Sequence, residues 1–315
     1  MNNLNKTLEI LNQTHREYQT SKCMLFFLSI LYGTISLVSV IGNSMIILVV
    51  YRNKKMRSVT NYFISNLALA DLVIGLFATP FQFQAAYLQR WIFPDIMCKI
   101  APFASTISAN VNITTLVAIS LDRYHVILHP LDQKLSKKQC ICIIIIIWVV
   151  SVSMSIGKLV NYSVFYFLDQ KQCGPQNDLL FKYEIIILAI LQYIVPFCLI
   201  SLTYFKIGYH IYFGYRPTSA NDIQSKTKRK AVKMVFIVVL LFIICWMPIQ
   251  VFNVLNVLFP DFVGSLKNVH IIWFFSNSFA ASNSCYNVFI YGICSNYLKW
   301  SRNLNLSDKL TKMNF

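Results

Sequence analysis

Charged residues are scarce in this chain of 315 residues: they make up 13% of it, about half the share usual in a soluble domain. Hydrophobic residues make up 56%, and the mean hydropathy is +0.55. This composition excludes a disordered chain, and a single soluble domain could not bury so much apolar surface. We therefore expect a protein that crosses a membrane several times.

Acidic residues are especially rare, with 12 Asp and Glu against 28 Lys and Arg and a net charge of +16. In a soluble chain this excess would indicate nucleic-acid binding. Here 19 of the basic residues, with only four acidic ones, fall in the segments 51–57, 122–138, 206–233 and 299–312. Short loops rich in Lys and Arg lie on the cytoplasmic side of a membrane. The charge therefore predicts an N-terminus outside and a C-terminus inside, and no nucleic-acid partner.

Long apolar stretches define the domain organisation, because a helix needs about 20 such residues to cross a bilayer. Seven stretches qualify, at 24–51, 60–88, 96–128, 139–160, 183–212, 230–258 and 268–293. The predicted fold class is an all-α membrane protein, a bundle of seven transmembrane helices over 24–293. Residues 1–23 are then an extracellular tail, and 294–315 a short cytoplasmic amphipathic helix and tail. The sequons at Asn5 and Asn12 predict glycosylation of the tail, with a chance match in an Asn-rich segment as the alternative.

The chain also lacks the residue patterns of membrane enzymes and transporters. The spans contain no Ser/His, paired-Asp or HExxH constellation, no inverted repeat, and no cysteine spacing typical of a metal site. We expect neither catalysis nor a cofactor. Cys98 and Cys173 both fall on the oxidising side, which favours a disulfide that pins their loop over the bundle mouth; two free thiols are the alternative.

A few strongly polar residues interrupt the spans, where they are costly and therefore candidates for function. Asp71 lies in the middle of the second span. The others are Asn43, Asn112, Asn283, Ser284 and Asn287. Together they predict either a hydrated cluster that holds a small cation such as sodium, or a purely structural hydrogen-bond network between helices.

Two further motifs lie at positions suited to a conformational switch. Asp122-Arg123-Tyr124 ends the third span, where the acid either restrains the arginine or simply pairs with it at the membrane interface. Pro248, two residues after Trp246, and Pro196 in the fifth span each remove a helical hydrogen bond. Such bends predict either a movable tryptophan or a packing kink.

The ordered set of motifs resembles the rhodopsin-like (class A) G-protein-coupled receptors over nearly the whole chain. The set comprises Gly42-Asn43, LALAD at 67–71, the Cys98/Cys173 pair, DRY at 122–124, Trp148, Pro196, FIICWMP at 242–248 and NSCYNVFIY at 283–291. Within the class, segments 77–99 and 282–292 are most similar to invertebrate kinin (leucokinin) receptors. Tachykinin, neuropeptide Y and neuropeptide FF receptors are the related alternatives.

The resemblance implies a role for each matching residue. Asp71, Asn112, Asn283, Ser284 and Asn287 would form a sodium pocket, although Asn112 stands where a serine is more usual. Arg123, restrained by Asp122, would engage the heterotrimeric G protein. Trp246 would be the toggle beneath the ligand, while Tyr204 and Tyr291 would swing inward on activation. The implied location is the plasma membrane, with membrane lipids and arrestin as further partners.

The chain departs from the family pattern at three places. Val288 replaces the proline of the NPxxY motif and restores a backbone donor, which raises the alternative of a receptor-like decoy impaired in signalling. Gly157-Lys158 stands where a proline is usual near the end of the fourth helix. The tail has no cysteine after Cys294, so the common palmitoyl anchor is not expected.

The ligand class follows from what the bundle mouth offers. Aminergic receptors use an aspartate in the third helix, and the corresponding residue here is Ser105. The residues predicted to line the mouth are Gln82, Gln84, Trp91, Ser105, Thr106, Gln192, Gln250, Asn253, Asn256, Trp273 and Asn277. Amides both donate and accept hydrogen bonds, as an amidated peptide requires. We expect Lys158 to bind a ligand carboxylate or to snorkel, 162–167 to form half of a β-hairpin lid, and a kinin-like peptide to signal through phospholipase C and calcium.

Overall fold

A computed structural model describes residues 22–88, 90–129, 131–167, 169–210, 222–266 and 269–294 of the chain. The elements are α2 (Lys22–Arg52), η1 (Lys54–Met56), α3 (Val59–Phe77), α4 (Thr79–Leu88), α5 (Asp95–Leu128), α6 (Lys137–Asn161), β1 (Tyr162–Phe167), β2 (Gln170–Pro175), α7 (Asp178–Ala189), η2 (Ile190–Ile194), α8 (Val195–Tyr209), α9 (Asp222–Leu258), α10 (Pro260–Ser265) and α11 (Val269–Cys294). The predicted sequons at Asn5 and Asn12 and the short helix within 294–315 lie outside the described residues.

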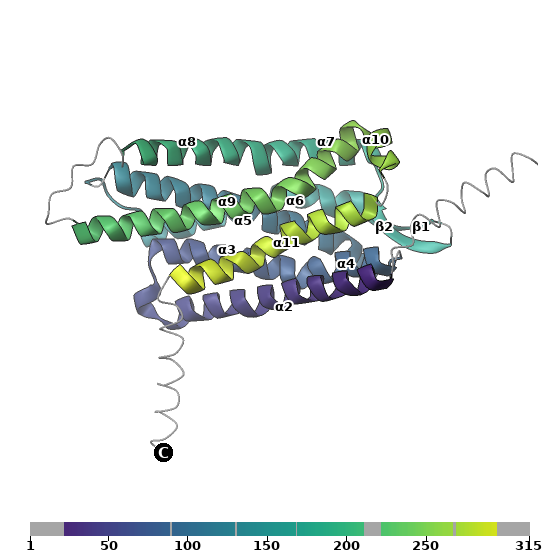
Figure 1. The fold of residues 1–315 in the computed structure, drawn as a ribbon, viewed down its shortest axis with the longest axis horizontal. Coiled ribbons are helices and arrows are strands. Elements are labelled where there is room, and N and C mark those ends of the chain that lie inside the picture. The colour runs from purple at the N-terminus through teal and green to yellow at the C-terminus, as the bar shows by residue number, and fades with distance from the viewer. Residues whose placement is uncertain are drawn as a thin grey trace, which may run out of the picture.

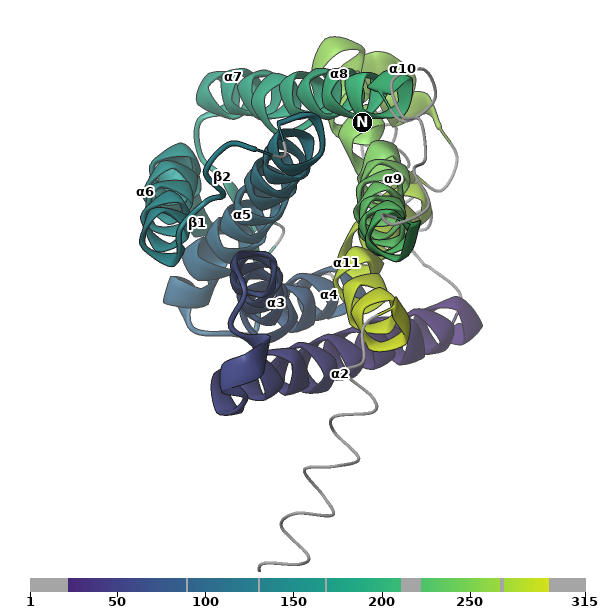
Figure 2. The same ribbon diagram turned by 90° about the vertical axis from the view of Figure 1, so that its left-hand side faces the viewer.

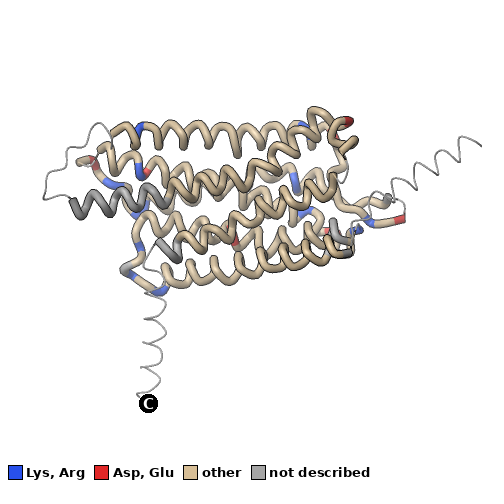
Figure 3. The backbone as a smooth tube through the Cα atoms, viewed as in Figure 1, with Lys and Arg blue, Asp and Glu red and all other residues tan. Residues whose placement is uncertain are grey.

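Long helices run side by side as one bundle (Figure 1). Six stretches are long and apolar enough to cross a membrane: Phe26–Arg52, Val59–Gln84, Asp95–Leu128, Lys137–Asn161, Asp178–Tyr209 and Val235–Leu258. α11 completes the bundle as the seventh, although serine and asparagine occupy much of its middle. The predicted seven-helix class is confirmed, and the charged residues gather near the two ends of the bundle (Figure 3).

The bundle has two distinct ends. The hairpin end carries β1, β2 and α10, whereas the opposite end carries the last turns of α5 and the start of α6 (Figure 1). Asp122 and Arg123 lie in these last turns of α5. Along the long axis, α6 lies at the rim (Figure 2). Only 22% of the apolar window of α6 is buried, against 67% for α5, whose polar residues are therefore covered by neighbouring helices.

The second and fifth spans are each interrupted; the break in the second was not predicted, whereas the fifth was predicted to bend at Pro196. The second breaks at Ala78, and Pro80 occupies the first turn of α4, where its missing N–H is tolerated. The fifth contains the π-helical turn η2 just before Pro196. Pro196 has no N–H to donate to the carbonyl of Gln192, and the widened turn accommodates this loss.

The predicted hairpin is present and antiparallel, with Tyr162 opposite Pro175 and Val164 opposite Cys173. Its turn includes Asp169 at φ 59°, a left-handed conformation that aspartate tolerates better than most residues. The backbone N–H of Trp91 donates to the carbonyl of Lys171 at 2.6 Å, which ties the hairpin to the α4–α5 connection.

The central core joins all seven spans except the α7 part of the fifth, with Phe63, Leu67, Leu116, Val238 and Phe242 almost completely buried. α2 approaches α11 closely beside this core. A Cβ placed on Gly42 would lie 2.5 Å from Cγ1 of Val288, so only glycine fits there without a shift. A valine in a helix is held in one rotamer and cannot easily turn away.

We predict that Gly42→Ala destabilises the protein by about 1–3 kcal/mol, because it overpacks the α2–α11 contact. The double variant Gly42→Ala/Val288→Ala should recover most of this loss, since it removes the two methyl groups in the way. Thermal unfolding of the detergent-solubilised protein measures both changes. Gly33→Ala is the matched control, because a Cβ on Gly33 meets nothing within 4 Å; equal losses at Gly33 and Gly42 would contradict the packing argument.

Candidate functional site

Asp71 is the centre of a buried polar cluster in the middle of the bundle. Its side chain is 0% exposed. The Asn112 amide of α5 donates to Oδ1 of Asp71 at 2.8 Å, and the Asn287 amide of α11 donates to Oδ2 at 2.9 Å. One carboxylate on α3 therefore holds two other helices at a fixed level.

Asn43 extends this cluster to α2. Its amide donates to the carbonyl of Ser39 at 2.9 Å and to the carbonyl of Ser284 on α11 at 3.1 Å. The hydroxyl of Ser39 in turn donates to the main-chain carbonyl of Asp71 at 2.9 Å. The predicted polar residues are thus brought together, with Asn283 and Ser284 also buried.

The cluster suits a small hard cation in its donor set. Two buried oxygens of α5, Asn112 Oδ1 and Ser108 Oγ, have no hydrogen-bond partner. These two residues are one helical turn apart and share a face of α5. Carboxylate, amide and hydroxyl oxygens are the ligands that hard cations prefer. Among the described residues no group of three or more His, Cys, Asp or Glu is gathered, as a transition-metal centre would require.

A second network, which the sequence analysis missed, lies beside the first. Asn66 of α3 donates to the hydroxyl of Thr115 on α5 at 2.8 Å and accepts from the indole N–H of Trp148 on α6 at 2.8 Å. Asn66 sits five residues before Asp71, so an intramembrane asparagine next to the aspartate was the available signal. This network fixes α6, which otherwise has little buried surface.

Arg123 is restrained at the end opposite the hairpin. Its guanidinium donates to Asp122 Oδ2 at 2.8 Å and also contacts the hydroxyl of Thr60 at the start of α3. The two charged side chains are 17% and 9% exposed, so the pair is largely shielded from solvent. Nearby, Tyr204 packs edge-on against Phe236 with ring centroids 5.3 Å apart. The Tyr291 side chain lies outside the described residues, as do the side chains of 222–234.

The fifth and sixth helices, which contain Pro196 and Pro248, meet beneath the hairpin end. Tyr193 in the π-turn donates its hydroxyl to the carbonyl of Ile243 on α9 at 3.0 Å. Trp246 is stacked on Phe242, with ring centroids 5.6 Å apart. The indole N–H of Trp246 and the amide N of Gln192 are buried donors that no protein acceptor meets.

The mouth at the hairpin end is covered by a disulfide-linked strand. Cys173 of β2 is bonded to Cys98 of α5, with an S–S distance of 2.00 Å, so the predicted disulfide is present. Trp91 is 4% exposed and packs edge-on against Phe93. Thr106 is also buried, and its hydroxyl donates to the carbonyl of Pro102 in its own helix.

The remaining residues predicted for the mouth differ in exposure. Those that are half-buried are Gln82, Ser105, Gln250, Asn253, Trp273 and Asn277, and they come from α4, α5, α9 and α11. Asn256 is exposed near the end of α9. Gln84 is also exposed, and it lines a groove between α4 and α2 together with Ser29.

Lys158 neither snorkels nor points to a free site, so the prediction made for it is wrong. Its ammonium pairs with Glu184 of α7 at 3.3 Å, and the two side chains are only 7% and 10% exposed. The rings of Tyr162 and Phe181 lie 5.3 and 5.2 Å from the ammonium. Burial, with a smaller contribution from the Glu184 charge, raises the pKa of Tyr162, so its phenol stays neutral.

Gly157 explains why the fourth helix lacks its usual proline here. A Cβ at this position would lie 3.1 Å from Oε1 of Glu184, so a larger residue would crowd the carboxylate. The Gly157-Lys158 pair therefore makes room for Glu184 and supplies its counter-charge. Nothing in the sequence marked Glu184 as the partner, because the two residues are on different helices.

We predict that Glu184→Ala destabilises the protein by about 3–5 kcal/mol, because it leaves the Lys158 ammonium buried without a counter-charge. Lys158→Met/Glu184→Met should restore stability to within about 1 kcal/mol, since it removes both charges. A double-mutant cycle of thermal unfolding measures the coupling.

The matched control for this cycle is the exposed pair of Lys171 and Asp95, at 3.8 Å with side chains 44% and 71% exposed. Lys171→Ala should cost less than about 1 kcal/mol. If Glu184→Ala lowered the free energy of unfolding by no more than this control, the prediction would be wrong. Lys158 would then have another partner or reach water in the variant.

The structure combines seven helices, a disulfide-linked hairpin over one end, a buried aspartate and a DRY triad at the other end. This combination defines the class of protein as a multi-pass membrane receptor. The sequence model of the 7 transmembrane receptor (rhodopsin family) matches residues 42–291. The chain therefore belongs to the rhodopsin family, whose members are signalling receptors and not enzymes.

Three curated relatives are each 32% identical to the chain. They are the QRFP-like peptide receptor of Branchiostoma floridae, the RYamide receptor of Tribolium castaneum and the Tachykinin-like peptides receptor 99D of Drosophila melanogaster. The matches cover 86%, 85% and 84% of this chain, and 74%, 77% and 53% of the relatives. The chain thus spans only about half the length of the third relative.

Proposed function

We propose that this receptor is activated by an extracellular neuropeptide and transmits the signal to a heterotrimeric G protein. The observation that carries the ligand class is the pair of buried donors on Gln192 and Trp246. Leaving such donors unpaired is costly, and a ligand rich in carbonyl groups would satisfy them. Ser105, in place of a carboxylate, speaks against an amine, and the names of the three relatives agree with a peptide.

The proposed orientation places the hairpin end outside the cell and the Asp122–Arg123 end in the cytoplasm of the plasma membrane. The excess of Lys and Arg in the loops of the latter end supports this. Asn5 and Asn12 are then available for glycosylation, and the G protein, and arrestin after it, would approach Arg123. Peptide binding favours a minor state in which the sixth helix bends outward at Pro248 and Asp122 releases the arginine.

We infer a kinin-like amidated peptide and signalling through phospholipase C and calcium as the first specific candidate. The resemblance of segments 77–99 and 282–292 to kinin receptors supports it. Peptides of the RYamide, tachykinin-like and QRFP-like classes are the alternatives that the three relatives favour.

We predict that cells expressing the receptor respond to one of these peptides with a calcium transient at nanomolar concentration. The panel contains amidated kinin, RYamide, tachykinin-like and QRFP-like peptides. Arg123→Ala is the control; it should abolish nucleotide exchange on the G protein while leaving surface expression unchanged. A response that survives Arg123→Ala would overturn the assignment of this residue.

Silence across the panel, with the receptor at the surface, would favour another G protein or the decoy alternative. Direct nucleotide exchange on purified G proteins separates the two. Val288→Pro then tests the decoy alternative itself, because that alternative requires signalling to appear when the usual proline is restored. If Val288→Pro does not signal either, the main argument for a decoy is removed.

We further propose that the Asp71 cluster binds sodium as a negative modulator. Sodium should suppress basal nucleotide exchange relative to an organic cation at equal ionic strength, and Asp71→Asn should abolish that difference, since it removes the only charge of the cluster. A coupling typical of allosteric sites corresponds to about fivefold or more. Asn112→Ser, which supplies the residue more usual in the family, should keep the effect. An unchanged sodium effect in Asp71→Asn would exclude the site.

A further inference from the structure

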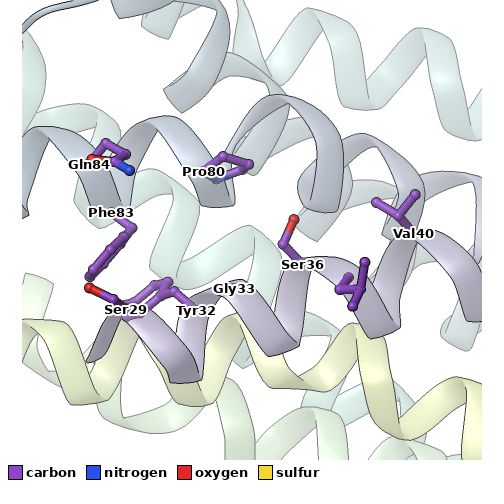
Figure 4. Close-up of a pocket in the computed structure, with 9 residues that line it drawn as sticks. Ser29, Tyr32, Gly33, Ser36, Val40, Pro80, Phe83 and Gln84 are labelled. Atoms are coloured by element: carbon purple, nitrogen blue, oxygen red, sulfur yellow. The ribbon is translucent and has the colours of Figure 1, made fainter. Parts of the chain in front are cut away.

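A groove between α2 and α4 belongs neither to the peptide mouth nor to the Asp71 cluster. It has a volume of about 560 Å³, within the range of roughly 300–1,000 Å³ typical of small-molecule sites. Nine residues line it: Ser29, Tyr32, Gly33, Ser36, Leu37, Val40, Pro80, Phe83 and Gln84. Figure 4 shows the labelled residues facing one another from the two helices.

The groove exists because two features of the sequence coincide. Pro80 begins α4 after the break at Ala78, so the second span changes direction beside α2. Opposite it, Gly33 leaves an open space, since a Cβ there would meet nothing within 4 Å. The neighbouring residues Ile30 and Leu37 on α2 are large and 54% and 61% exposed, so the gap at Gly33 is local.

The groove opens on the lipid-facing side of the bundle. Gly33, Leu37 and Gln84 are exposed, and they lie within two of the membrane-crossing stretches. From Ser29 to Val40, α2 rises about 16 Å at 1.5 Å per residue. This is close to half of the roughly 30 Å hydrocarbon thickness of a bilayer. The groove therefore spans one leaflet, the one at the hairpin end.

Polarity changes along the groove. Ser29 and Gln84 lie at one end of the groove, and Val40 lies at the other (Figure 4). Ser29 is the closer of the two α2 residues to the N-terminal end of α2, which is at the hairpin end of the bundle (Figure 1). None of the nine lining residues is charged. The rings of Tyr32 and Phe83 are stacked at 4.8 Å and present a stiff wall. A flat, neutral lipid with one small polar group at its end matches this arrangement better than a charged headgroup on flexible acyl chains.

We propose that this groove binds a membrane sterol, with its hydroxyl at Gln84 and its ring system against Gly33. The sterol contacts the second span at its proline break and so stabilises that break. The residues that line the groove include neither Gln192 and Trp246 nor Arg123, so its occupancy can be tested without a peptide or a G protein.

Photolabelling tests the proposal directly. The full-length receptor is reconstituted in lipid nanodiscs with a photoreactive sterol, and adducts are mapped by mass spectrometry. Adducts are expected on the α2 and α4 peptides, and Gly33→Leu should reduce them at least fivefold by filling the groove. Gly208→Leu is the matched control, because Gly208 is also in a helix and a Cβ placed there would meet nothing within 4 Å. This variant should leave labelling unchanged.

Competition identifies the occupant. Excess unlabelled sterol should remove the adducts, whereas phosphatidylcholine and the sterol methyl ether should compete poorly. Equal competition by phosphatidylcholine would mean that acyl chains fill the groove, and the sterol assignment would be wrong. Adducts that persist in Gly33→Leu would place the sterol elsewhere. Absent adducts, with loss of receptor–receptor energy transfer in Gly33→Leu, would assign the groove to a second copy of the chain.

A second variant covers the case in which Gly33→Leu does not fold, which the thermal melt and surface expression reveal. Gln84→Leu removes the polar end of the groove without adding bulk near Gly33. It should reduce the preference for the sterol over its methyl ether, because the ether lacks the hydroxyl donor. An unchanged preference would refute the proposed orientation.

Discussion

The buried carboxylate of Asp71 is the constraint on which the arrangement of the bundle depends. Its side chain is 0% exposed, and an amide from another helix donates to each of its two oxygens. Ser39 adds a bond to its main-chain carbonyl. Sliding α5 or α11 by one turn relative to α3 would break a hydrogen bond from a side-chain amide to a buried charge. Losing that hydrogen bond costs far more than losing one contact between apolar side chains. The polar cluster therefore sets the register that the surrounding apolar surfaces alone leave open.

The structure shows what Val288 does in place of the usual proline. Proline at this position would leave the carbonyl of Ser284 without its helical donor, and here that carbonyl already accepts a bond from Asn43. The valine side chain meanwhile fills the space opposite Gly42. With valine instead of proline, α11 keeps a regular helical hydrogen bond and gains side-chain packing against α2. The hydrogen bond from Asn43 to α11 is also present. Altered stiffness of α11 follows from this exchange more directly than loss of signalling does.

Features local in sequence or carried by composition could be predicted from the chain alone. The seven spans followed from apolar length, the hairpin from alternation in 162–167, and the disulfide from the side on which Cys98 and Cys173 fall. The break at Ala78 and the π-turn were missed, because a proline permits several outcomes and the neighbouring helices decide between them. The pair of Lys158 and Glu184 was missed for a different reason: it depends on the relative rotation of α6 and α7, which no local pattern encodes. Gln84 was assigned to the mouth on residue type, yet the same break at Ala78 sets it in the groove facing α2.

The link between the two ends of the bundle lies where regular helical bonding is already incomplete. Pro248 leaves the carbonyl of Ile244 without its donor, and one residue earlier the carbonyl of Ile243 accepts a bond from Tyr193 of the π-turn. Gln192 and Trp246, each with a buried donor that no protein acceptor meets, flank this contact on the fifth and sixth helices. A ligand carbonyl that engages either donor acts on two weakened turns joined by a single hydrogen bond. Because fewer helical bonds must be broken there, a change of bend at Pro248 costs less than in a regular helix, and the rigid Asp71 cluster gives the moving segment a fixed frame.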